Sequence, residues 1–215
     1  MRLWPQTLSK DLEYGILLPI AFFCPETRMT NRPFALNLTV LTTMILVVAL
    51  SRLIPHPPNF SPVEAMALFG GTYFARKSLA ILVPLIALFI SDLALGVMMG
   101  GEYFSYFTSA GFWLVYLTIA ALTVLGFGLR QRVTFTRVTV FSVLSALIFF
   151  LVTNFGVWWG ASFYPQTMAG LMAAYAAGLP FLQNGLLGTL FYSAMLFGGY
   201  ALIKSRLPHA GQQHA

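Results

Sequence analysis

Six apolar segments separated by short loops constrain this chain more than any other feature of its sequence. They cover residues 35–54, 62–75, 78–99, 107–129, 138–161 and 179–203. Hydrophobic residues make up 58% of the chain and charged residues only 8%, whereas charged residues form about 25% of an ordinary soluble domain. We therefore expect an all-α polytopic membrane protein with six transmembrane helices.

The second apolar segment is short and follows a proline-rich stretch. The prolines of Pro55-His56-Pro57-Pro58 disfavour a helix, so the chain before residue 62 should be extended. Ser61-Pro62-Val63-Glu64 has the pattern of a capping box, which predicts a helix that begins at Pro62. About 14 residues separate that start from the cations Arg76-Lys77, whereas crossing a bilayer takes about 20. The helix should therefore start inside the membrane, where irregular backbone must be buried or line a cavity.

The cations predict the orientation, because Lys and Arg accumulate in short cytoplasmic loops. They lie before the first segment, after the second, after the fourth and after the last, while the other loops hold only Arg52. We expect an inner-membrane protein with both termini in the cytoplasm. Residues 1–34 would form a cytoplasmic or interfacial segment, residues 35–203 the membrane domain and residues 204–215 a cytoplasmic tail.

Several other functions are disfavoured by the same composition. The formal charge of +6 does not indicate a nucleic-acid partner, because the cations mark the ends of apolar segments. Cys24 is the single cysteine, and two of the three histidines lie in the polar tail. We therefore expect no disulfide, no metal site and no cofactor.

Polar side chains from several segments should meet at one depth. Counting 1.5 Å per residue from the cytoplasmic cations places most of them roughly 20–30 Å away, in the outer half of the membrane. A charged group inside a bilayer is costly unless it is paired or solvated, so such residues are candidates for function. The predicted substrate-binding residues are His56, Asn59, Glu64, Asp92, Trp113, Tyr116, Asn154, Trp158, Tyr164 and Asn184.

Each candidate also has a structural explanation. Glu64 would complete the capping box, and Asn154 could tie two helices together. The tryptophans could belong to an interfacial aromatic belt. For Asp92 the explanation is weaker, since Arg52 is the one basic residue expected near its level. Residues 164–178 read as a turn and a short separate helix, which we expect to form an outer lid over the pocket.

Six motifs resemble those of an uncharacterised family of small bacterial membrane proteins described as transport proteins. They are PHPPNFSP at 55–62, LFGG at 68–71, SDLALG at 91–96, NFGVW at 154–158, YPQTMAGL at 164–171 and LPF at 179–181. That family is similar to the substrate-binding (S) components of energy-coupling factor (ECF) transporters. The resemblance implies an S-component-like bundle of six helices, a vitamin-like ligand near the outer surface, and either coupling to a membrane scaffold with ATPases or solitary operation. Where many S components carry small residues for the scaffold, this chain has Thr39 and Thr43.

The expected function is therefore that of a membrane transport protein that binds a small vitamin-like molecule for uptake and catalyses no reaction. Two alternatives stay open. One is an intramembrane enzyme that uses Glu64, Asp92 and His56 as acid and base, although the sequence contains no HExxH motif or phosphate-binding glycine loop. The other is a membrane scaffold protein without a ligand.

Overall fold

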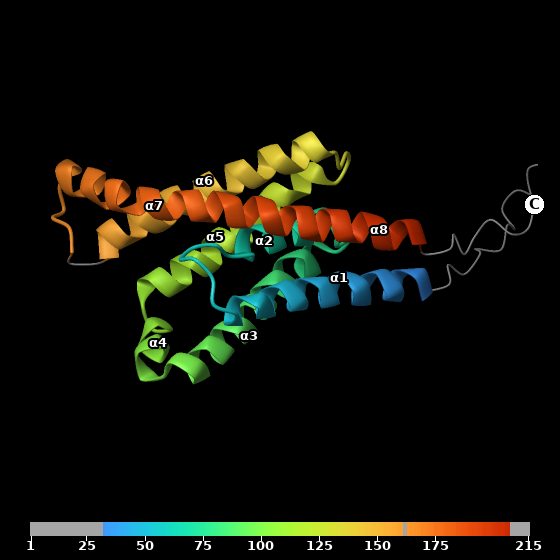
Figure 1. Cartoon of the computed structure of the whole chain (residues 1–215), viewed down its shortest axis with the longest axis horizontal. Coiled ribbons are helices and arrows are strands. Elements are labelled where there is room, and N and C mark those ends of the chain that lie inside the picture. Colours follow the sequence, from blue (N-terminus) through green and yellow to red (C-terminus); the bar gives the residue numbers. More distant parts are fainter. Residues whose placement is uncertain (1–31, 161–162, 207–215) are drawn as a thin grey trace, which may run out of the picture. The chain divides into compact units, whose positions relative to one another are not determined.

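The computed structural model describes residues 32–160 and 163–206, and every regular element in these ranges is helical (Figure 1). The expectations for residues 1–31, Cys24 and the tail beyond residue 206 lie outside the described residues. The helices are α1 (Arg32–Leu50), α2 (Val63–Tyr73), α3 (Lys77–Met99), α4 (Gly101–Tyr106), α5 (Ala110–Gly126), α6 (Phe135–Gly160), α7 (Met168–Ser193) and α8 (Gly199–Arg206). A 3-10 turn follows α1, another follows α5, and a π-helical turn joins α7 to α8.

Four helical stretches are long and apolar enough to cross a membrane. They are Lys77–Met99, Ala110–Leu129, Phe135–Gly160 and Met168–Arg206. Two of the six expected segments form shorter helices, the apolar helix Asn37–Leu53 and α2. Four long apolar helices are compatible with a multi-pass membrane protein, and the two shorter helices pack into the same core.

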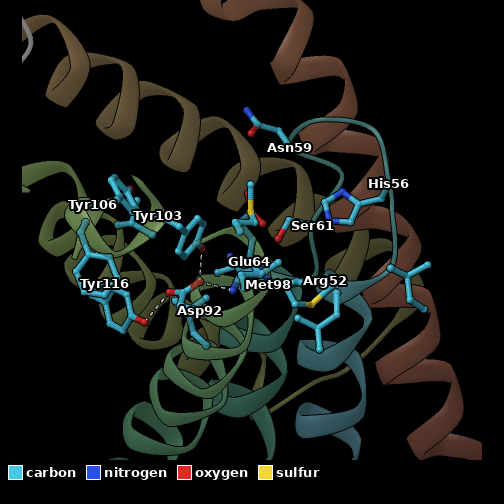
Figure 2. A pocket seen from close by; sticks show the side chains of 18 of the residues that line it. Arg52, His56, Asn59, Ser61, Glu64, Asp92, Met98, Tyr103, Tyr106 and Tyr116 are labelled. Atoms are coloured by element: carbon cyan, nitrogen blue, oxygen red, sulfur yellow. Dashed lines mark hydrogen bonds and ion pairs between the residues drawn. The ribbon is translucent and has the colours of Figure 1, made fainter. Parts of the chain in front are cut away.

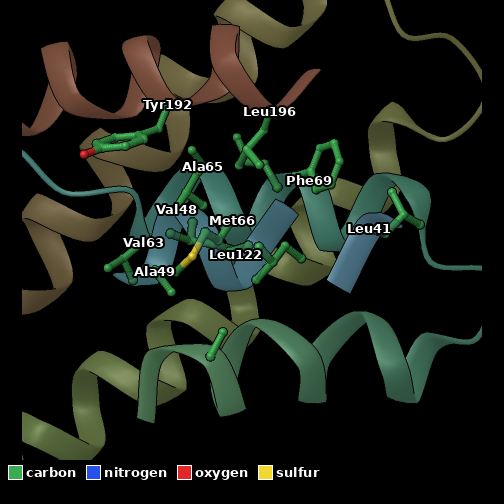
Figure 3. Packing of buried hydrophobic residues seen from close by; sticks show 14 of the residues in the cluster. Leu41, Val48, Ala49, Val63, Ala65, Met66, Phe69, Leu122, Tyr192 and Leu196 are labelled. Atoms are coloured by element: carbon green, nitrogen blue, oxygen red, sulfur yellow. The ribbon is translucent and has the colours of Figure 1, made fainter. Parts of the chain in front are cut away.

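Helix α2 forms the centre of the bundle. It contacts α3, α5, α6 and α7, and all of its residues except the last, Tyr73, are buried. Phe69 and Met66 pack among Leu122 of α5 and Leu196 from the turn after α7 (Figure 3). A helix that is apolar around its whole circumference is stable only when protein or lipid covers every side, and here other helices cover it.

Two glycines allow α2 and α5 to approach closely. A methyl group at Gly126 of α5 would lie 2.7 Å from the carbonyl oxygen of Leu68, and one at Gly71 of α2 would collide with the carbonyl oxygen of Thr123. Small residues at such crossings bring helix backbones together in membrane proteins. The contact places the second half of α2 beside the end of α5.

The two ends of α2 are held in different ways, and the expected capping box is wrong. Pro62 rather than Ser61 is the N-cap, no side chain caps the amides there, and the first helical bond runs from the Met66 amide to the Pro62 carbonyl. Proline has no amide hydrogen, so Pro62 leaves one backbone donor fewer for a cap to satisfy. At the other end, the Arg130 guanidinium donates to the carbonyls of Gly71 and Phe74 at 2.8 and 2.9 Å.

The proline-rich stretch forms an irregular loop, as expected. The Phe60 amide donates to the Pro57 carbonyl at 3.0 Å, and Asn59 has a φ of 63°. Proline followed by asparagine suits a turn whose third residue has a positive φ. Asn184 of α7 donates its side-chain amide to the Pro58 carbonyl at 3.0 Å, so the turn is tied to the bundle.

The expected separate lid helix is wrong. Residues from Met168 onward form one helix, α7, which continues through Pro180 to Ser193. Thr167 caps its start by accepting from the Gly170 amide, and membrane helices tolerate proline when neighbouring groups replace the lost bond. The loop after α3, which was expected on the outer side, also differs from the expectation, because it contains the short helix α4 before Ser109 caps α5.

Candidate functional site

A cavity of about 600 Å³ opens at one end of the bundle. It lies where the loop before α2 meets the start of α2, the last turns of α3, α4 and the first half of α5 (Figure 2). The labelled side chains that line it come from segments far apart in the sequence: Arg52, His56, Asn59, Ser61, Glu64, Asp92, Met98, Tyr103, Tyr106 and Tyr116. The cavity is therefore a product of the tertiary fold and not of any single motif.

Asp92 is the centre of a hydrogen-bonded network on one wall. Arg52 forms an ion pair with it, with Nη1 2.6 Å from Oδ1. The hydroxyl of Tyr103 donates to the same oxygen at 3.1 Å, and that of Tyr116 donates to Oδ2 at 2.7 Å. The Asp92 side chain is only 7% exposed, so these three donors replace the water that its charge has lost. Arg52 also donates to the hydroxyl of Ser91.

Tyr103 is protonated in this network. Burial, and then the nearby Asp92 carboxylate, raise the pKa of Tyr103 to about 12, because both disfavour the phenolate. The hydroxyl therefore keeps its proton at physiological pH and donates a hydrogen bond to Asp92. Since Tyr103 belongs to α4, the bond also holds that short helix against α3.

Glu64 carries an oxygen on the cavity wall that has no hydrogen-bond partner among the described residues. Its side chain lies in the first turn of α2, the residue is 3% exposed, and Oε2 makes no hydrogen bond. Among the described residues the only other buried side-chain polar atom without a partner is Oγ1 of Thr189. Glu64 also lines a smaller cavity beside Asn154 and Asn59. A buried oxygen without a donor is costly, so this position invites a partner that the protein does not supply.

Five of the ten predicted residues line the main cavity. These are His56, Asn59, Glu64, Asp92 and Tyr116. Asn154 lines the smaller cavity and donates to the Phe150 carbonyl of its own helix. The fold therefore brings five of the ten residues together at one cavity and a sixth beside it.

The other four residues do not line the cavity. Trp113 is 64% exposed on the outer surface of α5, where an interfacial tryptophan would lie. Trp158 donates to the Pro165 carbonyl and holds the connection between α6 and α7. Tyr164 lies in that same connection, and Asn184 is occupied with the Pro58 carbonyl.

Sequence reasoning placed Arg52 near the level of Asp92 without naming it as a site residue, and it missed Tyr103 and Tyr106. The signal for Arg52 was its position, since it was the one cation outside the loops expected in the cytoplasm. Tyr103 and Tyr106 lie on α4, which the sequence did not suggest as a helix. Without that helix, neither side chain could be placed at the cavity.

The geometry gives little support to acid–base or metal chemistry. Three donors occupy Asp92, and His56 is exposed with Nδ1 2.9 Å from the Pro57 carbonyl. Within residues 32–160 and 163–206 there is no group of three or more His, Cys, Asp or Glu side chains that could hold a metal ion. A cavity of about 600 Å³ with aromatic and polar walls has the dimensions of a small-molecule site.

A family model matches residues 33–210, which include nearly all of the described helices. The chain belongs to DUF6580, a family of unknown function. No curated protein and no solved structure matches this DUF6580 member. The resemblance to ECF S components stays a prediction from the sequence motifs.

Proposed function

We propose that this DUF6580 protein is a membrane transport protein that binds a small organic molecule in the cavity beside Asp92 and Glu64. The observation that carries the proposal is the cavity itself. Its volume of about 600 Å³ lies within the range of about 300–1,000 Å³ that is typical of small-molecule sites. Like such sites, it combines apolar and aromatic walls with a few convergent polar groups.

The distribution of the cations supports a cavity that faces the outside of the cell. The loops at the cavity end carry Arg52, which is used in the ion pair, whereas Arg76, Lys77, Arg130 and Arg137 lie between helices at the other end. Since cations favour the cytoplasmic side, both termini would be cytoplasmic and the inner membrane would be crossed six times, with α2 completing its crossing through the loop before it.

Cysteine labelling tests this orientation. In a Cys24→Ala background, a cysteine at the exposed Gln131, beside Arg130, should stay unlabelled by a membrane-impermeant maleimide applied to intact cells. A cysteine at the exposed His56 should be labelled under the same conditions. The reverse pattern would show that the cavity opens to the cytoplasm.

Blocking the cavity tests the binding function. Val115→Trp places a bulky ring on a residue that lines the cavity, so any small molecule that co-purifies with the wild type, detected by mass spectrometry, should be lost from the variant. Leu117→Trp on the same helix is the matched control, because Leu117 is 68% exposed and does not line the cavity. If both variants retain the same compounds as the wild type, the cavity is not the binding site.

If the protein does not act alone, it would contact a scaffold through the exposed face of α1. Thr39, Thr43 and Val47 are exposed, while Leu41 and Ile45 on the other side pack into the core. Short side chains spaced four residues apart allow another helix to approach closely. This face would accept a membrane-embedded partner without disturbing the cavity.

A further inference from the structure

The charges of the cavity do not cancel. Arg52, His56, Glu64 and Asp92 are its lining residues with ionisable acidic or basic side chains. Arg52 and Asp92 form a pair, and His56 lies exposed at the mouth, where water and salt screen its charge. The positive end of α2 contributes only about half an elementary charge. An ionised Glu64 therefore leaves the interior with negative charge.

The cavity is also short of hydrogen-bond donors for an anion. The strongest donors on its wall are Arg52 and the hydroxyls of Tyr103 and Tyr116, and all three donate to Asp92. A carboxylate or phosphate ligand would have to compete with that buried carboxylate for them. A ligand that brings its own donor to Glu64 meets no such competition.

Aromatic rings form a large part of the cavity wall around Asp92. Tyr106, Phe112 and Tyr116 line the cavity and contact one another, with ring centroids 5.6 Å apart for the first pair and 4.4 Å for the second. Tyr103 adds a fourth ring, 6.3 Å from Tyr106. The faces of such rings attract organic cations, because the ring quadrupole is negative above its plane.

We propose that the ligand is an organic cation, a protonated or quaternary amine with a flat or apolar body. Its cationic group would pair with Oε2 of Glu64, and its body would lie against the rings of Tyr106, Phe112 and Tyr116. This assignment rests on the proposed binding function and names the class of molecule that the cavity takes. It also accounts for the buried Glu64 oxygen that has no partner in the protein.

Three indoles of similar shape and different charge test the ligand class. Tryptamine is cationic, tryptophol is neutral and indole-3-acetate is anionic, and each can be titrated into the purified full chain by calorimetry at neutral pH. We expect tryptamine to bind about 10- to 100-fold more tightly than tryptophol, as a charge-assisted hydrogen bond should give, and indole-3-acetate to bind most weakly.

Two variants localise the effect. Glu64→Gln keeps the shape and removes the charge, so tryptamine should lose its advantage while the affinity for tryptophol stays unchanged. Glu64→Asp keeps the charge and should preserve the order of affinities. If Glu64→Gln does not fold, the order of the three affinities in the wild type and in Glu64→Asp still tests the ligand class.

Two results would overturn the assignment. The first is that the wild type binds tryptophol or indole-3-acetate with the same affinity as tryptamine, or binds none of the three. The second is that a neutral or anionic compound co-purifies with the wild type and is lost from Val115→Trp. The second result would leave the binding function intact and reject only the ligand class. Absence of any compound that depends on Val115 would reject the binding function itself.

Discussion

Arg52→Met is expected to lower the free energy of unfolding by roughly 3–5 kcal/mol, the usual cost of removing one partner of a buried ion pair. Asp92 would be left as a buried carboxylate whose remaining donors are the hydroxyls of Tyr103 and Tyr116. Two hydroxyls do not compensate for a lost guanidinium, so the carboxylate would be buried at a cost in free energy. Reversible unfolding in mixed micelles would measure the change.

A double variant separates the charge from the packing of the Arg52 side chain. In Arg52→Met with Asp92→Asn, the neutral amide oxygen can still accept from the tyrosines, so we expect at least half of the lost stability to return. Arg132→Met is the control, since Arg132 is exposed, and it should change the free energy of unfolding by less than about 0.5 kcal/mol. Equal losses in the single and double variants would show that the pair is not what stabilises this end of the bundle.

Gly126→Ala is expected to destabilise the protein by about 2–3 kcal/mol, although alanine normally favours a helix. Its methyl group would lie 2.7 Å from the Leu68 carbonyl oxygen and 3.1 Å from the Leu68 Cα, which are backbone atoms of α2 that cannot rotate away. The two helices would have to separate. The expected loss of stability is therefore in the upper part of the range that overpacking usually costs. The same unfolding assay measures it.

Gly111→Ala is the matched control on the same helix. A methyl group there would meet its nearest atoms at 3.7 Å, an ordinary contact. Replacing glycine by alanine inside a helix should then be neutral or stabilising by up to about 1 kcal/mol. If the two alanine variants have the same stability, the close crossing of α2 and α5 is not essential to the core.

Local patterns in the sequence predicted the helices well where one physical signal dominated. Long apolar runs define α3, α5 and α6. The stretch before α2 forms a loop because it has three prolines within four residues, and each of them also disfavours a helical conformation of the residue before it. Where two signals competed, the interpretation was wrong. Residues 164–178 were expected to end in a separate helix, but α7 runs from Met168 through Pro180, because neighbouring groups can replace the hydrogen bond that proline removes.

The site was less accessible from the sequence. Asp92 and Glu64 could be singled out because an acid in an apolar segment is costly, and both lie at the cavity. Depth along a helix does not reveal which direction a side chain faces, however. Trp113 and Tyr116 lie one turn of α5 apart, yet Trp113 is exposed while Tyr116 donates to Asp92.

The sequence by itself determined that this chain is helical, apolar enough for a membrane, and interrupted by an irregular loop before a short buried helix. Only the tertiary structure decided which of the two acids, Asp92 or Glu64, has hydrogen-bond donors for both of its oxygens. Arg52 is 40 residues from Asp92, and their pairing depends on how the turn after α1 meets α3. That meeting is set by packing between distant segments, which no local pattern encodes. Among the described residues it leaves Oε2 of Glu64 as a carboxylate oxygen without a hydrogen-bond partner.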